Sequence, residues 1–480
     1  MKLTLTPPAD PDGRAEGRRW AIWDGLFASF SDNLVIPFQV LFALYLGATK
    51  AQVGLLVAVP VLLGNLVQPL GASWTERRDE RKRIYLYANL LARLMWIPAG
   101  MLPFLLPRGP AAVYLFIALV TLRTVLASAP VPGWTSLMAD LTERSGRGAY
   151  FAWRNLMVNL AALGASVTAG WLIHGLPTAW GYLVTFLVAF VAGLFAFASF
   201  ARVPELPATG PPADPPQTRP TTGEDGTSAS PVTSSTRIPP PSSGAATHQQ
   251  GTLRAWLNLL SWHAMGGFLW SSALWSFSVN IAGPLMAVYY QETLHGDEGI
   301  WGLAQAATFL VTILSQRYWG RLADRWGSRR TALLSGIGAA LVPVPWLLAT
   351  RPTDAIWANA WSGLAWAGYN LAAFNLLLEM TAQEYRTRSV AVYNMVMGLT
   401  AAIGPMLGAM MGQYWGLLPV FALSTVLRLA SLVVIAHMVK AERDRPWRWS
   451  DLWWAAMGDN PASRWRVWYP SSRRGPGSSA

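Results

Sequence analysis

The sequence contains twelve runs of mostly apolar residues, each about 20 to 27 residues long, and its charged residues fall in short bursts between them. A helix rises ~1.5 Å per residue, so a run of this length crosses the ~30 Å hydrocarbon core of a bilayer. Charged residues make up only 13% of the chain. We therefore predict an all-α membrane protein with twelve transmembrane helices. The predicted spans are residues 20–46, 51–73, 84–106, 111–137, 149–173, 178–202, 264–290, 299–318, 331–350, 356–380, 389–412 and 415–440.

The lysine and arginine residues indicate how the chain threads the membrane. Fourteen of them lie in or beside the loops after the second, fourth, eighth and tenth runs, whereas the six opposite loops carry only Lys50, Arg108 and Arg351. Because short loops rich in Lys and Arg stay in the cytoplasm, we predict a multi-pass protein of the cell (inner) membrane with both termini cytoplasmic. This topology explains the net charge of +12 without a nucleic-acid partner. The chain has no cysteine, which excludes disulfides and thiolate metal ligands, and we predict no metal site.

A segment of different composition separates the runs into two sets of six. Residues 203–252 contain no aromatic residue and are dominated by Pro, Ser, Thr and Gly, so they cannot bury enough apolar surface to fold. We predict a disordered cytoplasmic linker at 203–255, with a segment that orders on a partner as the alternative. The other predicted parts are a cytoplasmic tail (1–19), two six-helix bundles (20–202 and 256–440) and a Trp/Arg-rich tail (441–480).

The two sets of runs carry matching sequences. The stretch FSDNLVIP at residues 30–37 recurs as FSVNIAGP at residues 277–284, a separation of 247 residues. A second match begins at Asp140 and Glu379, and a third pairs Gly71 with Gly320. Near-constant separations indicate that each half contains six elements in the same order. We therefore predict an internal duplication, which is common in secondary transporters.

A charged stretch after the eighth run reveals a family resemblance. Residues 320–330 read GRLADRWGSRR, which resembles the G-x-L-a-D-r-x-G-r-[KR] signature of the major facilitator superfamily. The matching residues are Gly320, Leu322, Ala323, Asp324, Arg325, Gly327 and Arg329. Ser328 departs from the signature. Together with the twelve spans and the central linker, the resemblance covers nearly the whole chain and implies two bundles that rock about a central cavity.

The resemblance also implies a gate at the cytoplasmic side. In the family, the acid of the signature contacts the start of the eleventh helix, which here implies Asp324 as a partner of that helix dipole. The signature arginines would pair with acids at neighbouring helix ends, with Glu379 as one of them. The first-half copy begins at Gly71 but has Thr75 in place of the Asp, so Glu76 is the candidate substitute. A purely topological role for the arginines is the alternative.

Two ionisable residues lie deep in helices that the resemblance places at the cavity. Asp32 is roughly 18 Å into the first helix from the cytoplasm and Arg123 roughly 21 Å into the fourth, so they can lie at one level. Ionisable residues at such depth are usually functional, and we predict that this pair couples transport to protons. A static pair that braces the two helices is the alternative. Asp24 is expected to be solvated or paired with Arg18 or Arg19.

The resemblance further implies that polar and aromatic residues on the helices around the cavity line the substrate site. The candidates are Ser31, Asn33, Trp275, Ser276, Asn280, Trp366 and Asn370. Apolar walls with a few hydrogen-bonding groups suit an amphiphilic organic molecule. Tryptophan also packs against lipid and between helices, which is the alternative for the aromatic candidates.

The sequence contains no GxxxxGK[ST] loop, serine elbow or H-E-x-x-H motif, so we predict no ATP site, no cofactor and no enzymatic activity. We predict a proton-coupled exporter or exchanger of small organic molecules that works by alternating access, as a monomer in the bilayer. A sugar or nutrient symporter or uniporter is the alternative, and a transporter-like sensor or a lipid scramblase is the alternative from another class. Tryptophan alternating with arginine in the C-terminal tail predicts contact with lipid headgroups, with RNA as the alternative.

Overall fold

The computed structural model describes residues 13–78, 81–142, 147–204, 263–380 and 386–438, and every regular element within these ranges is a helix. The helices of the first half are α1 (Arg14–Val35), η1 (Ile36–Phe38), α2 (Gln39–Tyr45), α3 (Lys50–Arg78), α4 (Arg81–Leu94), α5 (Trp96–Leu105), α6 (Pro110–Ser128), α7 (Val131–Leu141), α8 (Arg147–Gly175) and α9 (Thr178–Ala201). Those of the second half are α11 (His263–Glu292), α12 (Glu298–Trp326), α13 (Ser328–Ala340), α14 (Pro343–Leu348), α15 (Asp354–Met380), α16 (Arg386–Tyr414) and α17 (Leu417–Met438).

Within the described residues these helices form twelve passages along the molecule, six in each half. Four passages are interrupted, between α1 and α2, α4 and α5, α6 and α7, and α13 and α14. Proline has no backbone N–H with which to continue the helical hydrogen bonds, so it bends or ends a helix. The prolines at or just after the interruptions are Pro37, Pro98, Pro130 and Pro343.

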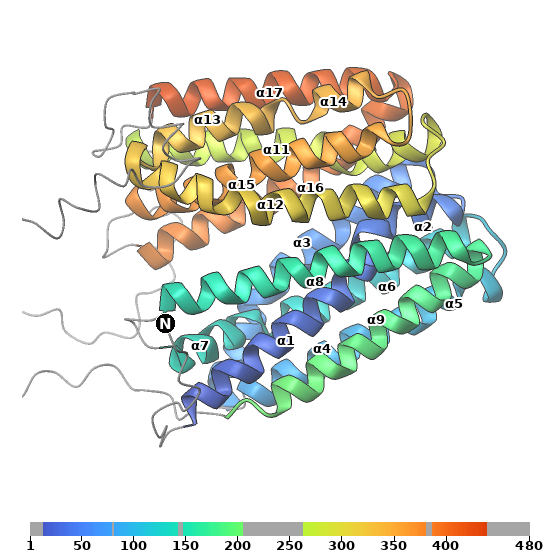
Figure 1. Ribbon diagram of the computed structural model, residues 1–480, viewed down its shortest axis with the longest axis horizontal. Coiled ribbons are helices and arrows are strands. Elements are labelled where there is room, and N and C mark those ends of the chain that lie inside the picture. Colours follow the sequence, from blue (N-terminus) through green and yellow to red (C-terminus); the bar gives the residue numbers. More distant parts are fainter. Residues whose placement is uncertain (1–12, 79–80, 143–146, 205–262, 381–385, 439–480) are drawn as a thin grey trace, which may run out of the picture.

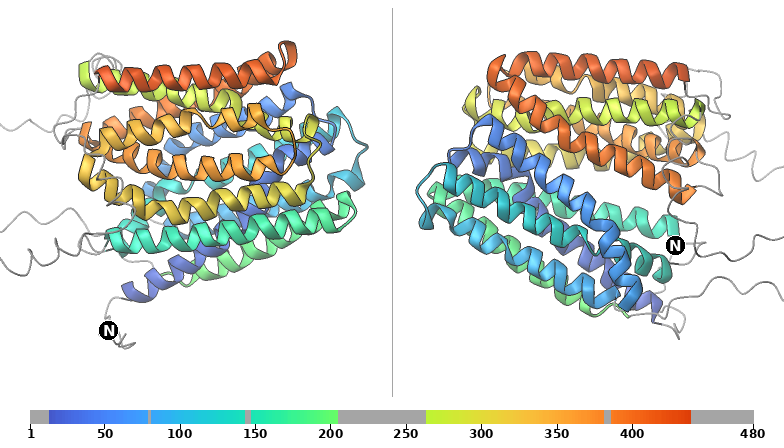
Figure 2. Two further views of the ribbon diagram at one scale, coloured as in Figure 1. Left: turned by 45° about the horizontal axis from the view of Figure 1, so that its top comes forward. Right: turned by 180° about the vertical axis from the view of Figure 1, so that it is seen from behind.

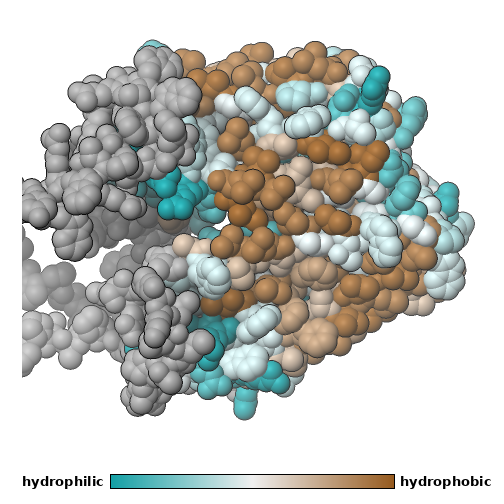
Figure 3. All heavy atoms as spheres, viewed as in Figure 1, coloured by the Kyte–Doolittle hydropathy of each residue, from teal (hydrophilic) through white to brown (hydrophobic). Residues whose placement is uncertain are grey.

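Ten of the passages are long and apolar enough to span a membrane, as judged on the described residues. The other two, α11 and α15, have 30 and 27 residues and are long enough, but their Ser, Asn and Trp residues lower the mean hydropathy. An apolar band covers the middle of the molecular surface (Figure 3), as contact with lipid tails requires. The prediction of an all-α membrane fold with two duplicated six-helix bundles is confirmed.

Several helices extend beyond the predicted spans. The signature expected in a loop is helical, because α12 continues to Trp326 and ends only at Gly327, where φ is 86°. A bilayer fixes the length of the apolar stretch but not that of the helix, so charged turns continue into water. Helix α1 likewise begins at Arg14, within the predicted tail. The predicted linker from residue 205 and the tail at 441–480 lie outside the described residues.

The two halves lie against each other at one end and diverge at the other (Figures 1 and 2). We call the end where α1 begins and α17 finishes the linker end, and the opposite end the far end. In the first half α1 packs on α8 and α9, and in the second half α11 packs on α16 and α17. The halves meet where α8 packs on α12 and α3 packs on α16.

The duplicated stretch adopts the same local structure in both halves. Asn33 Nδ2 donates hydrogen bonds to the backbone oxygen of Ser29 at 2.9 Å and to Ser29 Oγ at 3.3 Å. Asn280 Nδ2 donates to the same two atoms of Ser276, at 2.8 and 3.4 Å. Each serine lies four residues before its asparagine, one helical turn away. The repeat is therefore structural as well as sequential.

Candidate functional site

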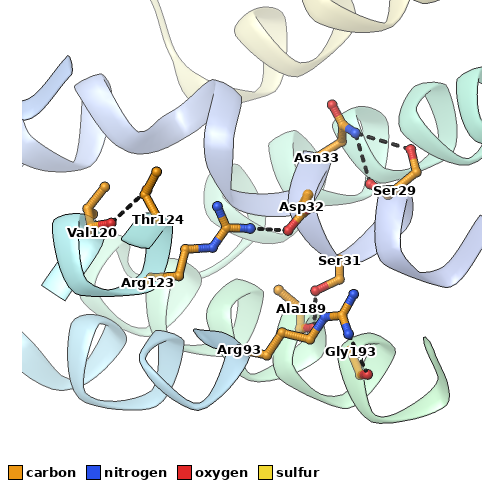
Figure 4. Close-up of polar contacts among 10 residues, drawn as sticks. All are labelled: Ser29, Ser31, Asp32, Asn33, Arg93, Val120, Arg123, Thr124, Ala189 and Gly193. Atoms are coloured by element: carbon orange, nitrogen blue, oxygen red, sulfur yellow. Dashed lines mark hydrogen bonds and ion pairs between the residues drawn. The ribbon is translucent and has the colours of Figure 1, made fainter. Parts of the chain in front are cut away.

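Asp32 on α1 and Arg123 on α6 form an ion pair, Asp32 Oδ1 with Arg123 Nη2 (Figure 4). The guanidinium carbon of Arg123 also lies 4.8 Å from the ring centroid of Trp96, which is fully buried and stacks on Phe186. The Asp32 side chain is 35% exposed, whereas the Arg123 side chain is 11% exposed. The arginine is thus held between an aromatic face and a carboxylate, and the carboxylate is the more accessible partner. Proton coupling through this pair remains a prediction.

Ser31 does not line a cavity in this structure, contrary to expectation. It is fully buried, and its hydroxyl donates to the backbone oxygen of Ala189 on α9 at 2.6 Å (Figure 4). Successive helical residues project ~100° apart, because a turn takes 3.6 residues. Ser31 therefore faces α9 in the bundle interior, while Asp32 faces Arg123 on α6. Asn33 is partly exposed, and its side-chain amide donates a hydrogen bond to the backbone oxygen of Ser29.

Asp24 is buried rather than solvated, which corrects the expectation for this residue. It is 1% exposed, and neither carboxylate oxygen has a hydrogen-bond partner among the described residues. The guanidinium groups of Arg93 and Arg154 are the opposite charges that act on it. Arg93 is itself buried and donates to the backbone oxygen of Gly193 at 3.4 Å (Figure 4). Helices α8 and α9 pack on α1 and enclose this carboxylate, a tertiary effect that sequence position did not indicate.

A cavity of about 300 Å³ lies in the second half between α11, α15 and α16. Five of the predicted lining residues meet there. They are Trp275, Ser276, Asn280, Trp366 and Asn370. The cavity also includes Val279 and Tyr369, which the sequence had not singled out. The position of Val279 was signalled by the repeat, since it is the counterpart of Asp32. The roles of these residues in binding remain predictions.

A second cavity, of about 250 Å³, lies between the two halves near the far end. It is lined by both prolines of the duplicated stretch, Pro37 and Pro284, and by Trp301 on α12. Trp301 Nε1 donates to the backbone oxygen of Pro37 at 2.9 Å, which joins the halves directly beside the cavity.

Polar contacts between the halves cluster at the far end. Among the described side chains, four such contacts join the halves, and all lie at this end. One is the bond from Trp301, and in the other three the second half supplies acids. These three are Lys50 Nζ with Glu292 Oε2 (3.2 Å), His174 Nδ1 with Asp297 Oδ1 (3.4 Å) and Tyr182 Oη, which donates to Glu298 Oε1 (3.2 Å). The far end is thereby closed.

The second-half signature lies at the linker end. Glu379 accepts a hydrogen bond from Ser328 Oγ at 2.7 Å, so the residue that departs from the signature contacts the expected acid. Arg329 donates to the backbone oxygen of Ala436 near the end of α17, where helix carbonyls lack intrahelical partners. Asp324 is exposed on α12. Its expected partner, the start of α16, has side chains outside the described ones.

The first-half copy of the signature is tightly packed. A Cβ atom on Gly71 would lie 1.8 Å from the backbone oxygen of Ala129, so only glycine fits between α3 and the end of α6. Arg81 Nη1 lies 3.0 Å from Asp140 Oδ2, an ion pair that sequence reasoning did not assign although Asp140 had been matched to Glu379. The side chain of Glu76 lies outside the described ones.

Two duplicated bundles of six membrane-length helices, closed at one end and with cavities in and between them, define the fold of a secondary transporter. The sequence pattern described as "Major Facilitator Superfamily" matches residues 25–279 and 268–452. The chain belongs to the major facilitator superfamily, and it is a membrane transporter of that family.

Individual relatives agree with this assignment. A protein of Deinococcus radiodurans named "Putative sugar efflux transporter" is 24% identical over 434 residues, covering 85% of this chain and 94% of the relative. The "Multidrug resistance protein MdtG" of Salmonella paratyphi A is 27% identical over 171 residues, 35% of this chain and 41% of that protein. The solved structure of a D-xylose-proton symporter shares the fold, with a TM-score of 0.65 at 13% identity, over 90% of this chain and 99% of that one. These relatives are transporters rather than enzymes.

Proposed function

We propose that this protein couples proton movement to the export or exchange of small organic molecules by alternating access. The observation that carries the proposal is the accessible Asp32, paired with Arg123. Its repeat counterpart, Val279, lines the cavity of the second half. Asn370 lies 247 residues after Arg123, the separation that relates Asp32 to Val279, and it lines the same cavity. This correspondence supports a cavity-facing position for the ion pair in the first half.

The conformation fits one state of such a cycle. We assign the linker end to the cytoplasm of a cell (inner) membrane because its loops carry most of the lysines and arginines. On this assignment the halves are closed outside and diverge toward the cytoplasm (Figure 1). Rocking the halves about the α8–α12 and α3–α16 contacts would open the far end. We further propose a monomer that uses the proton gradient and no cofactor.

The ion pair supplies a way to link protons to this motion. A protonated Asp32 carries no charge, so its attraction for Arg123 falls when the proton binds. Arg123 remains on the Trp96 ring, while Asp32 becomes free to change partners. A proton taken up on one side and released on the other then accompanies each change of state.

The first experiment compares proton release by purified wild type and Asp32→Asn during a ligand screen in detergent. We expect ligand-triggered release in the wild type, and continued binding without release in the variant. Glu16→Gln, which removes an exposed acid from the same helix, should behave as wild type. Ligand binding without proton release in the wild type would refute coupling at Asp32 and favour a facilitator or a sensor.

Proton-coupled uptake of a sugar or nutrient is the second candidate function. It is favoured by the likeness to the D-xylose-proton symporter, although the Deinococcus radiodurans relative is named for efflux. The two functions differ in direction only. In vesicles with an imposed pH gradient, a symporter accumulates cargo in the alkaline compartment, whereas an exchanger accumulates it in the acidic one.

A further inference from the structure

The cavity of the second half has a wall chemistry that selects a class of cargo. We propose that it binds a neutral, hydroxyl-bearing ring compound of the sugar or glycoside class, and that its exchange for a proton therefore moves net charge across the membrane. This inference rests on the proposed function and specifies the cargo of that same site.

The first argument concerns charge. None of the thirteen residues that line the cavity is Asp, Glu, Lys, Arg or His. An ion that leaves water for such a wall loses hydration without gaining a counter-charge. The ionised groups of the proposed site are on the other half, where Asp32 and Arg123 already neutralise each other. A neutral molecule is therefore favoured over an ammonium or a carboxylate.

The second argument concerns the shape of the aromatic wall. The rings of Trp275 and Tyr369 stack, with centroids 4.2 Å apart and planes inclined by 25°. Trp366 stands edge-on to both, at 68° to Trp275 and 87° to Tyr369. The three rings form a corner with two nearly perpendicular aromatic surfaces. A ring compound with apolar C–H faces can pack against such surfaces through dispersion and burial of apolar area.

The third argument concerns unused hydrogen-bonding groups. The Asn280 amide nitrogen is engaged by Ser276, and its carbonyl oxygen makes no hydrogen bond to the described residues. Asn370 is exposed at the cavity, and its amide makes none with them either. Hydroxyl groups both donate and accept, so a polyol can pair with the oxygen and the N–H groups of these amides, where a hydrocarbon cannot.

An electrical consequence follows from holding the proton and the cargo on different halves. If a neutral molecule crosses one way while one proton crosses the other, each cycle transfers one positive charge. A membrane potential then drives transport even when the pH is equal on both sides. Exchange of a singly charged cation for one proton would transfer no net charge.

The first test is calorimetric binding to the purified full chain. The neutral probes are methyl and phenyl glycosides and disaccharides, and the matched charged probes are phenylalkylamines and phenylalkyl carboxylates. We expect binding by at least one neutral probe, weakened more than tenfold by Trp366→Ala and by Asn370→Ala. Trp366→Phe should retain part of the affinity. Trp357→Ala is the matched control, because Trp357 is on the same helix but is 76% exposed and is not part of this cavity.

Three results would overturn the cargo assignment: no binding by the whole neutral panel, tighter binding by a charged probe, or equal affinity in the cavity variants.

The second test uses vesicles at equal pH with a potassium diffusion potential. We expect the potential to drive transport of the bound probe in wild type and not in Asp32→Asn. Cavity-dependent binding without a response to potential would refute proton coupling while the cargo class stands. If the potential drives transport of a probe but the cavity variants do not weaken its binding, the cargo class is refuted and proton coupling stands.

Discussion

The two halves share the local structure of the duplicated stretch but differ in the charge that this stretch carries. Asn33 and Asn280 make the same hydrogen bonds to Ser29 and Ser276. At the position directly before each asparagine, however, the first half has Asp32 and the second has Val279. The first half buries further charges near its pair, whereas the cavity of the second half is uncharged. In our proposal this difference has a functional meaning, because the first half binds the proton and the second half binds the cargo.

The largest predicted difference between the halves concerns the glycines that open the two signature copies. Gly71→Ala should destabilise the protein by about 3 kcal/mol, because the added methyl group meets the backbone of Ala129 and cannot be accommodated by a side-chain shift. Gly320→Ala should be neutral or stabilising by about 0.5–1 kcal/mol, since no atom lies within 4 Å of its Cβ position and alanine favours helix. Thermal unfolding of the purified variants measures both. Equal effects would show that the copies are packed alike.

Introducing the first-half charges into the second half tests whether cargo binding requires an uncharged cavity. Val279→Asp places an unpaired carboxylate in the uncharged cavity, and we expect neutral probes to bind at least ~10-fold more weakly, about 1.4 kcal/mol. Adding Asn370→Arg supplies the counterpart of Arg123 and should recover thermal stability through a new ion pair. It should not recover binding. Calorimetry and thermal unfolding on the single and double variants separate the two effects. Full binding by the single variant would contradict a cavity selective for neutral molecules.

The hydrogen bond between Trp301 and Pro37, which joins the halves at the far end, is expected to have a smaller effect. Trp301→Phe removes the hydrogen bond to the backbone oxygen of Pro37, worth about 1 kcal/mol, and should shift the equilibrium roughly fivefold toward a state open at the far end. The chain has no cysteine, so spin labels at Leu176→Cys and Leu348→Cys report the separation of the halves. Trp346→Phe alters the same cavity without removing a bond between the halves. An equal shift in this control would assign the effect to packing.

The fold was predictable because its main constraint, the length of an apolar helix in a bilayer, is local. The repeat was likewise visible in sequence. The family resemblance pointed to Asn280 and Asn370 as cavity residues, and both lie at one cavity. Contacts between distant helices were not predictable in this way. Ser31 was wrongly assigned to the cavity because adjacent helical residues face different directions. Asp24 was expected to be solvated or paired with Arg18 or Arg19, but the packing of α8 and α9 on α1 buries it near Arg93 and Arg154. The bond from Trp301 to Pro37 joins residues from opposite halves and had no sequence signal.

The charge contrast between the halves is reversed at the far end, where the acids belong to the second half. The contact of His174 with Asp297 should favour closure of the far end, because it joins α8 to the residue that precedes α12 in the other half. The two side chains are 64% and 38% exposed, and such surface pairs contribute about 0–1 kcal/mol. With the same label pair, His174→Gln should therefore shift the equilibrium roughly twofold toward a state open at the far end. High salt should reduce the effect of the substitution, because exposed charges are screened. No shift at low salt, or a shift toward the closed state, would show that this contact does not hold the far end closed.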